Sequence, residues 1–265
     1  MIDDLRIGLV QMDLAWEDPA ANRERATEML AGQEGKHDLV VLPEMFATGF
    51  SMEPARLAET MEGDSIQWMQ ATAARLETVV VGSLIIEEEG QYFNRLLIVS
   101  KNGVGMHYDK RHLFRMAGEH QVYRMGTRLQ AFGVKGWRIC PQICYDLRFP
   151  VWTRNYHEGE GRLWYDAVIY VANWPAKRAA HWNALLKARA IENQAYAIGV
   201  NRVGTDGNGI EYSGDSAILD YQGRELDHGF RAPRLLTASL AHGPLHEYRQ
   251  RFPAWLDADQ YELKD

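Results

Sequence analysis

Cysteine is scarce in this 265-residue chain, which contains only Cys140 and Cys144. Two cysteines are too few for a disulfide scaffold, and such low usage is typical of proteins kept in a reducing cytoplasm. Asp3 and Asp4 stand where a secretory signal peptide would carry positive charge. No Asn-x-Ser/Thr sequon occurs. We therefore expect a cytoplasmic protein.

Long hydrophobic runs and clusters of basic residues are also missing. The longest apolar stretches have the length of buried strands, well below the roughly 18 residues of a membrane span. The chain carries 29 basic and 36 acidic residues, a net charge of −7, and has no Lys/Arg run longer than two. Nucleic-acid-binding domains usually present a basic face. The sequence therefore argues against both membrane and nucleic-acid partners.

Several common catalytic and binding motifs are absent. There is no Gly-x-Ser-x-Gly nucleophile elbow, and the segment His246–Gln250 has Gln where a zincin helix needs its second His. Neither a P-loop nor a complete dinucleotide fingerprint occurs, and the two cysteines show no credible metal-ligand spacing with nearby histidines. These absences argue against zinc and nucleotide chemistry.

Short apolar runs alternate with amphipathic stretches, and no internal repeat or low-complexity linker interrupts them. This alternation predicts a single α/β domain over residues 1–265. We expect strands over residues 5–11, 39–42, 79–87, 92–100, 104–108, 137–143, 167–172, 216–221 and 235–239. We expect helices over residues 20–33, 65–77 and 178–196, the second with Asp64 or Ser65 as its N-cap.

The C-terminal segment 241–265 is polar, with Phe252, Pro253 and Trp255 as isolated large residues. Such a segment either lies on the surface with a few aromatic anchors or packs at a subunit interface. Both interpretations stay open, and we carry the interface forward as the prediction.

Three reactive side chains follow three predicted strands. Glu44 ends a buried run, Lys110 follows the strand ending at Tyr108, and Cys144 follows the strand ending at Ile143. Because sites in parallel α/β sheets form at the carboxyl ends of strands, these groups are candidates for one site. Taken singly, each has a simpler explanation: a buried thiol, a paired or capping carboxylate and a lysine in a solvated turn.

Together the three groups form a chemical unit. A cysteine attacks as its thiolate, and a buried carboxylate such as Glu44 is suited to accept its proton. Lys110 would stabilise negative charge on a substrate oxygen. The backbone N–H of Tyr145, directly after the nucleophile Cys144, would add a second oxyanion donor.

These segments resemble the nitrilase (carbon–nitrogen hydrolase) superfamily from about residue 6 to residue 240. Four matches carry the resemblance together: Leu-Pro-Glu at 42–44, Tyr-x-Lys-x-His-Leu-Phe at 108–114, Gly-Glu-His at 118–120 and Cys-Tyr-Asp-Leu-Arg-Phe-Pro at 144–150. The segment 189–193 matches the helix that follows.

The resemblance implies a four-layer α-β-β-α sandwich that forms a homodimer or a larger homo-oligomer. It implies Cys144 as nucleophile, Glu44 as general base and Lys110 as oxyanion stabiliser, with Glu119 as a supporting glutamate. The implied reaction is amide hydrolysis through a cysteine thioester, and it needs neither a metal nor an organic cofactor. For Glu119, a role in positioning Lys110 is the more economical of two, the other being proton transfer.

Within the superfamily, segments 171–175 and 201–204 are similar to the bacterial omega-amidase branch, which hydrolyses the terminal amide of 2-oxoglutaramate and related oxo acids. Since such a substrate carries a carboxylate, we expect a cation in the pocket, with Arg115, Lys177 and Arg178 as candidates. The expected pocket walls are the aromatic residues Phe46, Tyr92, Phe114 and Trp174. We expect Asp146 and Arg148 to organise the turn after the nucleophile by pairing.

Other functions remain open on the sequence. A nitrilase or an N-carbamoyl hydrolase would share the triad, because pocket shape distinguishes these activities. A non-catalytic interaction protein would use the same scaffold. A redox sensor would pair Cys144 with Cys140 as the resolving thiol.

Overall fold

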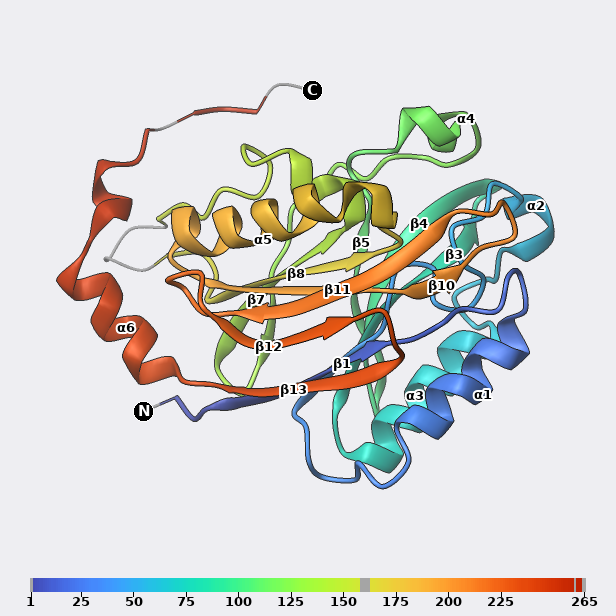
Figure 1. The fold of residues 1–265 in the computed structure, drawn as a ribbon, viewed down its shortest axis with the longest axis horizontal. Coiled ribbons are helices and arrows are strands. Elements are labelled where there is room, and N and C mark those ends of the chain that lie inside the picture. The colour runs from blue at the N-terminus through green and yellow to red at the C-terminus, as the bar shows by residue number, and fades with distance from the viewer. Residues whose placement is uncertain (1, 158–162, 260, 264–265) are drawn as a thin grey trace.

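Two β-sheets lie face to face in this protein, and helices cover their outer faces (Figure 1). The structure is a computed structural model that describes residues 2–157, 163–259 and 261–263. The four-layer α-β-β-α sandwich expected from the sequence is therefore confirmed.

The first sheet has six strands in the order β13-β1-β2-β3-β4-β5. Its central strands β1, β2 and β3 are parallel, whereas β13, β4 and β5 are added in antiparallel pairs. In this order the strands span Arg234–Leu240, Leu5–Gln11, Leu39–Val41, Val79–Glu88, Gln91–Ser100 and Gly103–Asp109.

The second sheet has seven strands, six of them in the order β10-β11-β9-β8-β7-β6, with β12 paired to β11. Strands β7, β8 and β9 are parallel. The first six span Val203–Thr205, Glu211–Leu219, Tyr196–Asn201, Ala167–Ala172, Trp137–Ile143 and Phe132–Val134, and β12 spans Glu225–Phe230.

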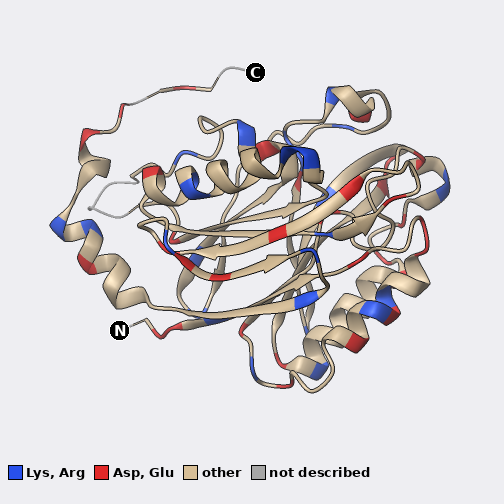
Figure 2. Ribbon diagram, viewed as in Figure 1, with Lys and Arg blue, Asp and Glu red and all other residues tan. Residues whose placement is uncertain are grey.

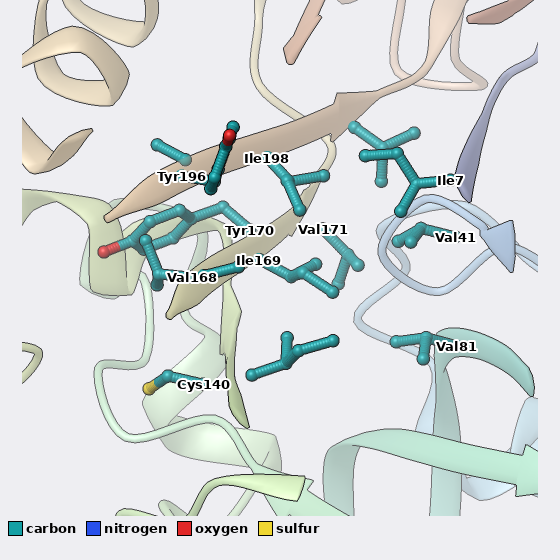
Figure 3. Packing of buried hydrophobic residues seen from close by; sticks show 14 of the residues in the cluster. Ile7, Val41, Val81, Cys140, Val168, Ile169, Tyr170, Val171, Tyr196 and Ile198 are labelled. Carbon is teal, nitrogen blue, oxygen red and sulfur yellow. The ribbon is translucent and has the colours of Figure 1, made fainter. Parts of the chain in front are cut away.

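The main core lies between the two sheets. Alternate residues of β1 and β2, such as Ile7 and Val41, point from the first sheet toward Ile169 and Val171 of β8 (Figure 3). Since side chains alternate across a strand, Val10 belongs instead to a second cluster beneath helices α1 (Pro19–Met29) and α3 (Asp64–Leu76).

Helix α5 (Ala179–Asn193) covers the outer face of the second sheet (Figure 1). Its Trp182 and Leu186 are fully buried against β9. They pack so closely on Gly199 that a Cβ atom at this position would clash with them. The remaining helices are short: α2 (Pro54–Leu57), α4 (Glu119–Val122), α6 (His242–Arg251) and the 3₁₀ turns η1 (Arg115–Ala117), η2 (Cys144–Arg148), η3 (Ala176–Arg178) and η4 (Ala254–Asp257).

Several predicted boundaries were wrong. The helix predicted over 20–33 ends at Met29, and the N-cap of α3 is Gly63 rather than Asp64 or Ser65. The helix predicted over 178–196 ends at Asn193, because Gln194 takes a left-handed conformation and the chain then enters β9. Strands β6, β9, β10 and β12 were not predicted.

Part of the C-terminal segment folds onto its own chain. Helix α6 buries Leu245, and its Arg249 contacts Asp166 at 2.9 Å between Nη1 and Oδ1. The remainder exposes Phe252 and Leu256. The expected subunit interface therefore stays a prediction.

Charges of both signs are spread over the helices and loops, while the buried strands carry few (Figure 2). No helix in the described part of the chain is both long enough and apolar enough to cross a membrane.

Candidate active site

The three reactive residues predicted from strand ends line one cavity of about 540 Å³. Glu44 lies just beyond β2, Lys110 directly follows β5, and Cys144 directly follows β7. Strands β2 and β5 belong to the first sheet and β7 to the second, so the cavity lies where strand ends of both sheets meet. The structure thus brings together groups that are up to 100 positions apart in the chain.

Lys110 lies between two carboxylates. Its Nζ donates to Glu44 Oε1 at 2.7 Å and to Glu119 Oε1 at 3.0 Å, and all three side chains are buried. Burial acts to lower the pKa of Lys110, but the charges of Glu119 and Glu44 outweigh it and the pKa is raised. Lys110 is therefore a fixed positive charge that can act as an oxyanion stabiliser.

Glu119 is the first residue of α4, and its two oxygens have different tasks. Oε1 accepts from Lys110, whereas Oε2 accepts from the Phe114 backbone N–H at 2.5 Å. Burial raises the pKa of Glu119, Lys110 opposes the rise, and the charge of Glu44 adds to it. Glu119 thus links the loop that carries Phe114 to the lysine of the site.

Two asparagines that the sequence analysis did not select hold Glu44 in place. Asn94 Nδ2 donates to Glu44 Oε1 at 2.8 Å, and the Asn173 backbone N–H donates to Glu44 Oε2 at 2.8 Å. Asn173 lies in the segment 171–175, just beyond β8. The sequence offered little to single out Asn94. It is a polar residue within β4, whose other residues are mostly apolar.

Cys144 adopts a left-handed backbone conformation with φ of +44°, which is uncommon outside glycine. The conformation turns the chain abruptly from β7 into η2. Burial, the charge of Glu44 and a hydrogen bond to Glu44 raise the pKa of the Cys144 thiol, although Lys110 acts in the opposite direction. The raised pKa favours the thiol form of Cys144, and the Glu44 carboxylate lies beside it.

Asp146 organises the turn after Cys144, although not by pairing with Arg148 as expected. Its carboxylate accepts hydrogen bonds from the Ile143 N–H at 3.1 Å and from the His112 N–H at 2.9 Å. Arg148 instead contacts His181. The expected pairing of Asp146 with Arg148 was therefore wrong.

Tyr145, the predicted backbone oxyanion donor, is the second residue of η2. The first N–H groups of a helix have no acceptor within the helix, so the Tyr145 N–H is free of intrahelical bonding. The Tyr145 side chain lines the cavity and packs edge-on against Phe114, with ring centres 5.0 Å apart.

Four of the five predicted substrate-binding residues line the cavity, namely Phe114, Trp174, Lys177 and Arg178. Arg115, the fifth, is not one of the described residues that line it. Of the other two expected walls, Phe46 is fully buried beneath the first sheet, and Tyr92 packs in a separate apolar cluster.

Arg148 joins the cavity lining and was not among the predicted cations. Its guanidinium carbon lies 4.7 Å from the centre of the Trp174 ring, and that of Arg178 lies 5.4 Å from the centre of the Phe114 ring. The cavity therefore combines the Cys144 thiol with two arginines, Arg148 and Arg178, that stack on aromatic rings. Among the described residues, no group of three or more His, Cys, Asp or Glu side chains is arranged to hold a metal ion.

The sequence profile of the carbon–nitrogen hydrolase family matches residues 6–250. The chain belongs to this family. The match covers every residue of the Glu44, Lys110 and Cys144 arrangement, which the nitrilase resemblance had indicated. This carbon–nitrogen hydrolase is an amide-hydrolysing enzyme.

Relatives match this carbon–nitrogen hydrolase over almost its entire length. It is 47% identical to omega-amidase YafV of Escherichia coli K12 over 261 residues, 98% of each chain. It is 32% identical to 2-oxoglutaramate amidase of Bacillus subtilis, covering 95% of this chain and 96% of the relative.

A solved structure supports the fold. The CN-hydrolase superfamily protein XC1258 of Xanthomonas campestris, a crystal structure with an arsenic adduct in its active site, superposes with a TM-score of 0.96. The two chains are 46% identical, and the match covers 98% of this chain and 99% of the other.

Proposed function

We propose that this enzyme hydrolyses the terminal carboxamide of a small omega-amide of a dicarboxylic oxo acid, such as 2-oxoglutaramate, to the acid and ammonia. The observation that carries the proposal is the Cys144 thiol beside Glu44 and Lys110 in a cavity that also holds Arg148 and Arg178. The names of the relatives, omega-amidase and 2-oxoglutaramate amidase, support the substrate class.

The first half of the reaction forms a thioester. Cys144 Sγ attacks the amide carbon while its proton passes to Glu44, and the carbonyl oxygen becomes an oxyanion held by Lys110 and the Tyr145 N–H. The C–N bond then breaks, and Glu44 gives its proton to the departing nitrogen, which leaves as ammonia. The acyl group remains bonded to Cys144.

The second half releases the acid. A water molecule attacks the thioester carbon while Glu44 accepts one of its protons, and the oxyanion forms again beside Lys110. The C–S bond breaks, Glu44 returns its proton to the sulfur, and the carboxylic acid leaves. Glu119 holds Lys110 in register throughout and exchanges no proton with substrate.

In this proposal the substrate carboxylate, at the end away from the amide, binds positively charged side chains. Arg148 and Arg178 are held on the faces of Trp174 and Phe114, which fixes their planes and leaves N–H donors for a carboxylate. Lys177, which is exposed at the cavity, adds charge at a longer reach. Arg115 remains a weaker candidate, because it lies outside the described lining.

We further propose that residues 1–265 form one domain and that the enzyme works as a cytoplasmic homodimer. One apolar cluster spans both sheets, which supports a single domain. A catalytic thiol needs a reducing compartment to stay active. The exposed side chains of Phe252, Leu256 and Tyr261 in the C-terminal segment favour a subunit contact there.

Ammonia release tests the proposed reaction. The purified enzyme is assayed with 2-oxoglutaramate, succinamate, glutamine, N-carbamoyl-β-alanine and a simple nitrile, beside Cys144→Ala as the matched control. We expect activity on the oxo-acid amide that Cys144→Ala abolishes. Activity on the carbamoyl compound or the nitrile in its place would overturn the substrate assignment, and full activity of Cys144→Ala would overturn the mechanism.

A further inference from the structure

Asn94, on strand β4, bridges the two carboxylates that also share Lys110. Its side chain is fully buried. Nδ2 donates to Glu44 Oε1 at 2.8 Å and to Glu119 Oε1 at 3.2 Å. An amide NH₂ carries two hydrogens, so one group can serve both oxygens.

The backbone of Asn94 also fixes the position of Lys110. Its carbonyl oxygen accepts the Lys110 N–H at 3.0 Å. The residue itself is held in the antiparallel pairing of β3 and β4, where it lies opposite Ile85. One strand position therefore sets the geometry of all three charged groups.

The orientation of the Asn94 amide leaves its side-chain oxygen buried and without a hydrogen-bond partner among the described residues. An unsatisfied buried acceptor costs stability, and an apolar side chain of similar size would avoid that cost. Stability alone therefore does not account for an asparagine at this position.

We infer that Asn94 is a positioning residue that orients Glu44 and Glu119 on Lys110 and favours the ionised form of Glu119. Hydrogen bonds to a charged carboxylate favour the charged form, and two neighbouring carboxylates disfavour it in each other. With the Asn94 donor removed, the two Oε1 atoms would keep only Lys110 as a donor, while the Asn173 and Phe114 N–H groups still bind the Oε2 atoms. The inference rests on the proposed function, in which Glu44 must be ionised to accept the thiol proton.

Four titratable groups face these carboxylates from the surrounding elements: Lys110, Cys144, Tyr123 and Tyr212. Burial is the main influence that raises the pKa of Cys144 and of both tyrosines, and carboxylate charges add to it. With their pKa values raised, these three groups titrate on the alkaline side, and the raised pKa of Lys110 favours its charged form. An acid-side titration would therefore report on the carboxylates.

The test compares Asn94→Ala and Asn94→Leu with wild type, using Asn155→Ala as the matched control. Asn155 is equally buried and hydrogen-bonded, but it binds Tyr165 and Asn193 rather than the site. We expect kcat on 2-oxoglutaramate to fall about tenfold or more in both Asn94 variants, with little change in KM. The acid limb of kcat/KM should move to higher pH by about one unit.

The control separates positioning from folding. Asn155→Ala should lower the unfolding temperature without moving the acid limb, whereas Asn94→Leu should move the limb while retaining most of the stability. The inference is overturned if the limb stays in place in both Asn94 variants, or if both fail to fold.

A second readout is independent of the substrate. The rate at which iodoacetamide alkylates Cys144 is followed by mass spectrometry as a function of pH, and its acid limb should shift upward in the Asn94 variants. If wild type released no ammonia from any amide, the proposed function would fail, and the alkylation profile would still decide on Asn94.

Discussion

The ammonium nitrogen of Lys110 lies 2.7 Å from a carboxylate oxygen of Glu44, and both side chains are almost completely removed from solvent. The pair joins residues 66 positions apart, at the ends of β2 and β5. An ion pair in this setting is costly to break from either side, because each partner would leave a buried charge behind. In the proposed mechanism the same contact positions the base and the oxyanion stabiliser.

Glu44→Gln should remove the general base while keeping the shape of the side chain. We expect ammonia release to fall by about 10²–10⁴-fold, the usual contribution of proton transfer by a positioned side chain. The matched control is Glu53→Gln, since Glu53 also lines the cavity but is exposed. Equal losses in the two variants would contradict the assignment of the base.

Arg148→Ala and Arg178→Ala should raise KM for 2-oxoglutaramate by about tenfold or more, since each removes charged hydrogen-bond donors from the carboxylate. KM for a neutral amide such as propionamide should change little. Arg115→Ala is the control, because Arg115 lies outside the described lining. If the arginine variants weaken both substrates equally, the cations do not recognise a carboxylate.

Lys110→Met should destabilise the fold as well as abolish activity. The change leaves Glu44 and Glu119 buried without their cation, and breaking a buried pair in this way costs about 3–5 kcal/mol. Urea unfolding at pH 7 measures the loss. Since burial raises the pKa of Glu119, the cost should shrink as the pH falls and this carboxylate takes up a proton.

Two comparisons check that explanation of the Lys110 effect. Lys177→Met removes an exposed lysine at the same cavity and should leave the free energy of unfolding nearly unchanged. The double variant Lys110→Met/Glu119→Gln should recover part of the lost stability. Failure of the second change to restore any stability would argue against charge burial as the cause.

Gly199→Ala should destabilise the packing of α5 on β9. A Cβ at Gly199 would lie 2.5 Å from Leu186 Cδ1 and 2.7 Å from Trp182 Cζ2, far inside normal contact. Overpacking of this kind typically costs about 1–3 kcal/mol.

Gly243→Ala is the opposite case and serves as the control. A Cβ at Gly243 meets no described atom within 4 Å, and the residue lies in helix α6. Alanine favours a helix over glycine by up to about 1 kcal/mol, so the melting temperature should stay the same or rise. Thermal unfolding of both variants measures the contrast.

The grouping of Glu44, Lys110 and Cys144 at one cavity was predictable because each residue follows a predicted strand. Strand ends are local features, and the motifs around Glu44, Lys110 and Cys144 lie directly beside them. The edge strands β6 and β10 were missed since each is only three residues long, too short for a clear period in the sequence.

The supporting residues were harder to find, because their roles depend on pairing between distant segments. Asn94 reaches both carboxylates only through the register of β4 between β3 and β5. Phe46, by contrast, was predicted to line the pocket and does not. It follows Glu44 by two positions, yet it packs beneath the first sheet, since Met45 takes a left-handed conformation with φ of +42° and the turn redirects the chain.

The sequence by itself determined the class of fold and the family and indicated the candidate reacting groups, because hydrophobic period and short motifs are local properties of the chain. Only the tertiary structure decided which polar residues hold Glu44, and that Arg148 rather than Arg115 lies with Arg178 and Lys177 at the cavity. The physical reason is that a buried charge is stabilised by whichever donors the packing of two sheets brings within about 3 Å, and no local pattern records that distance.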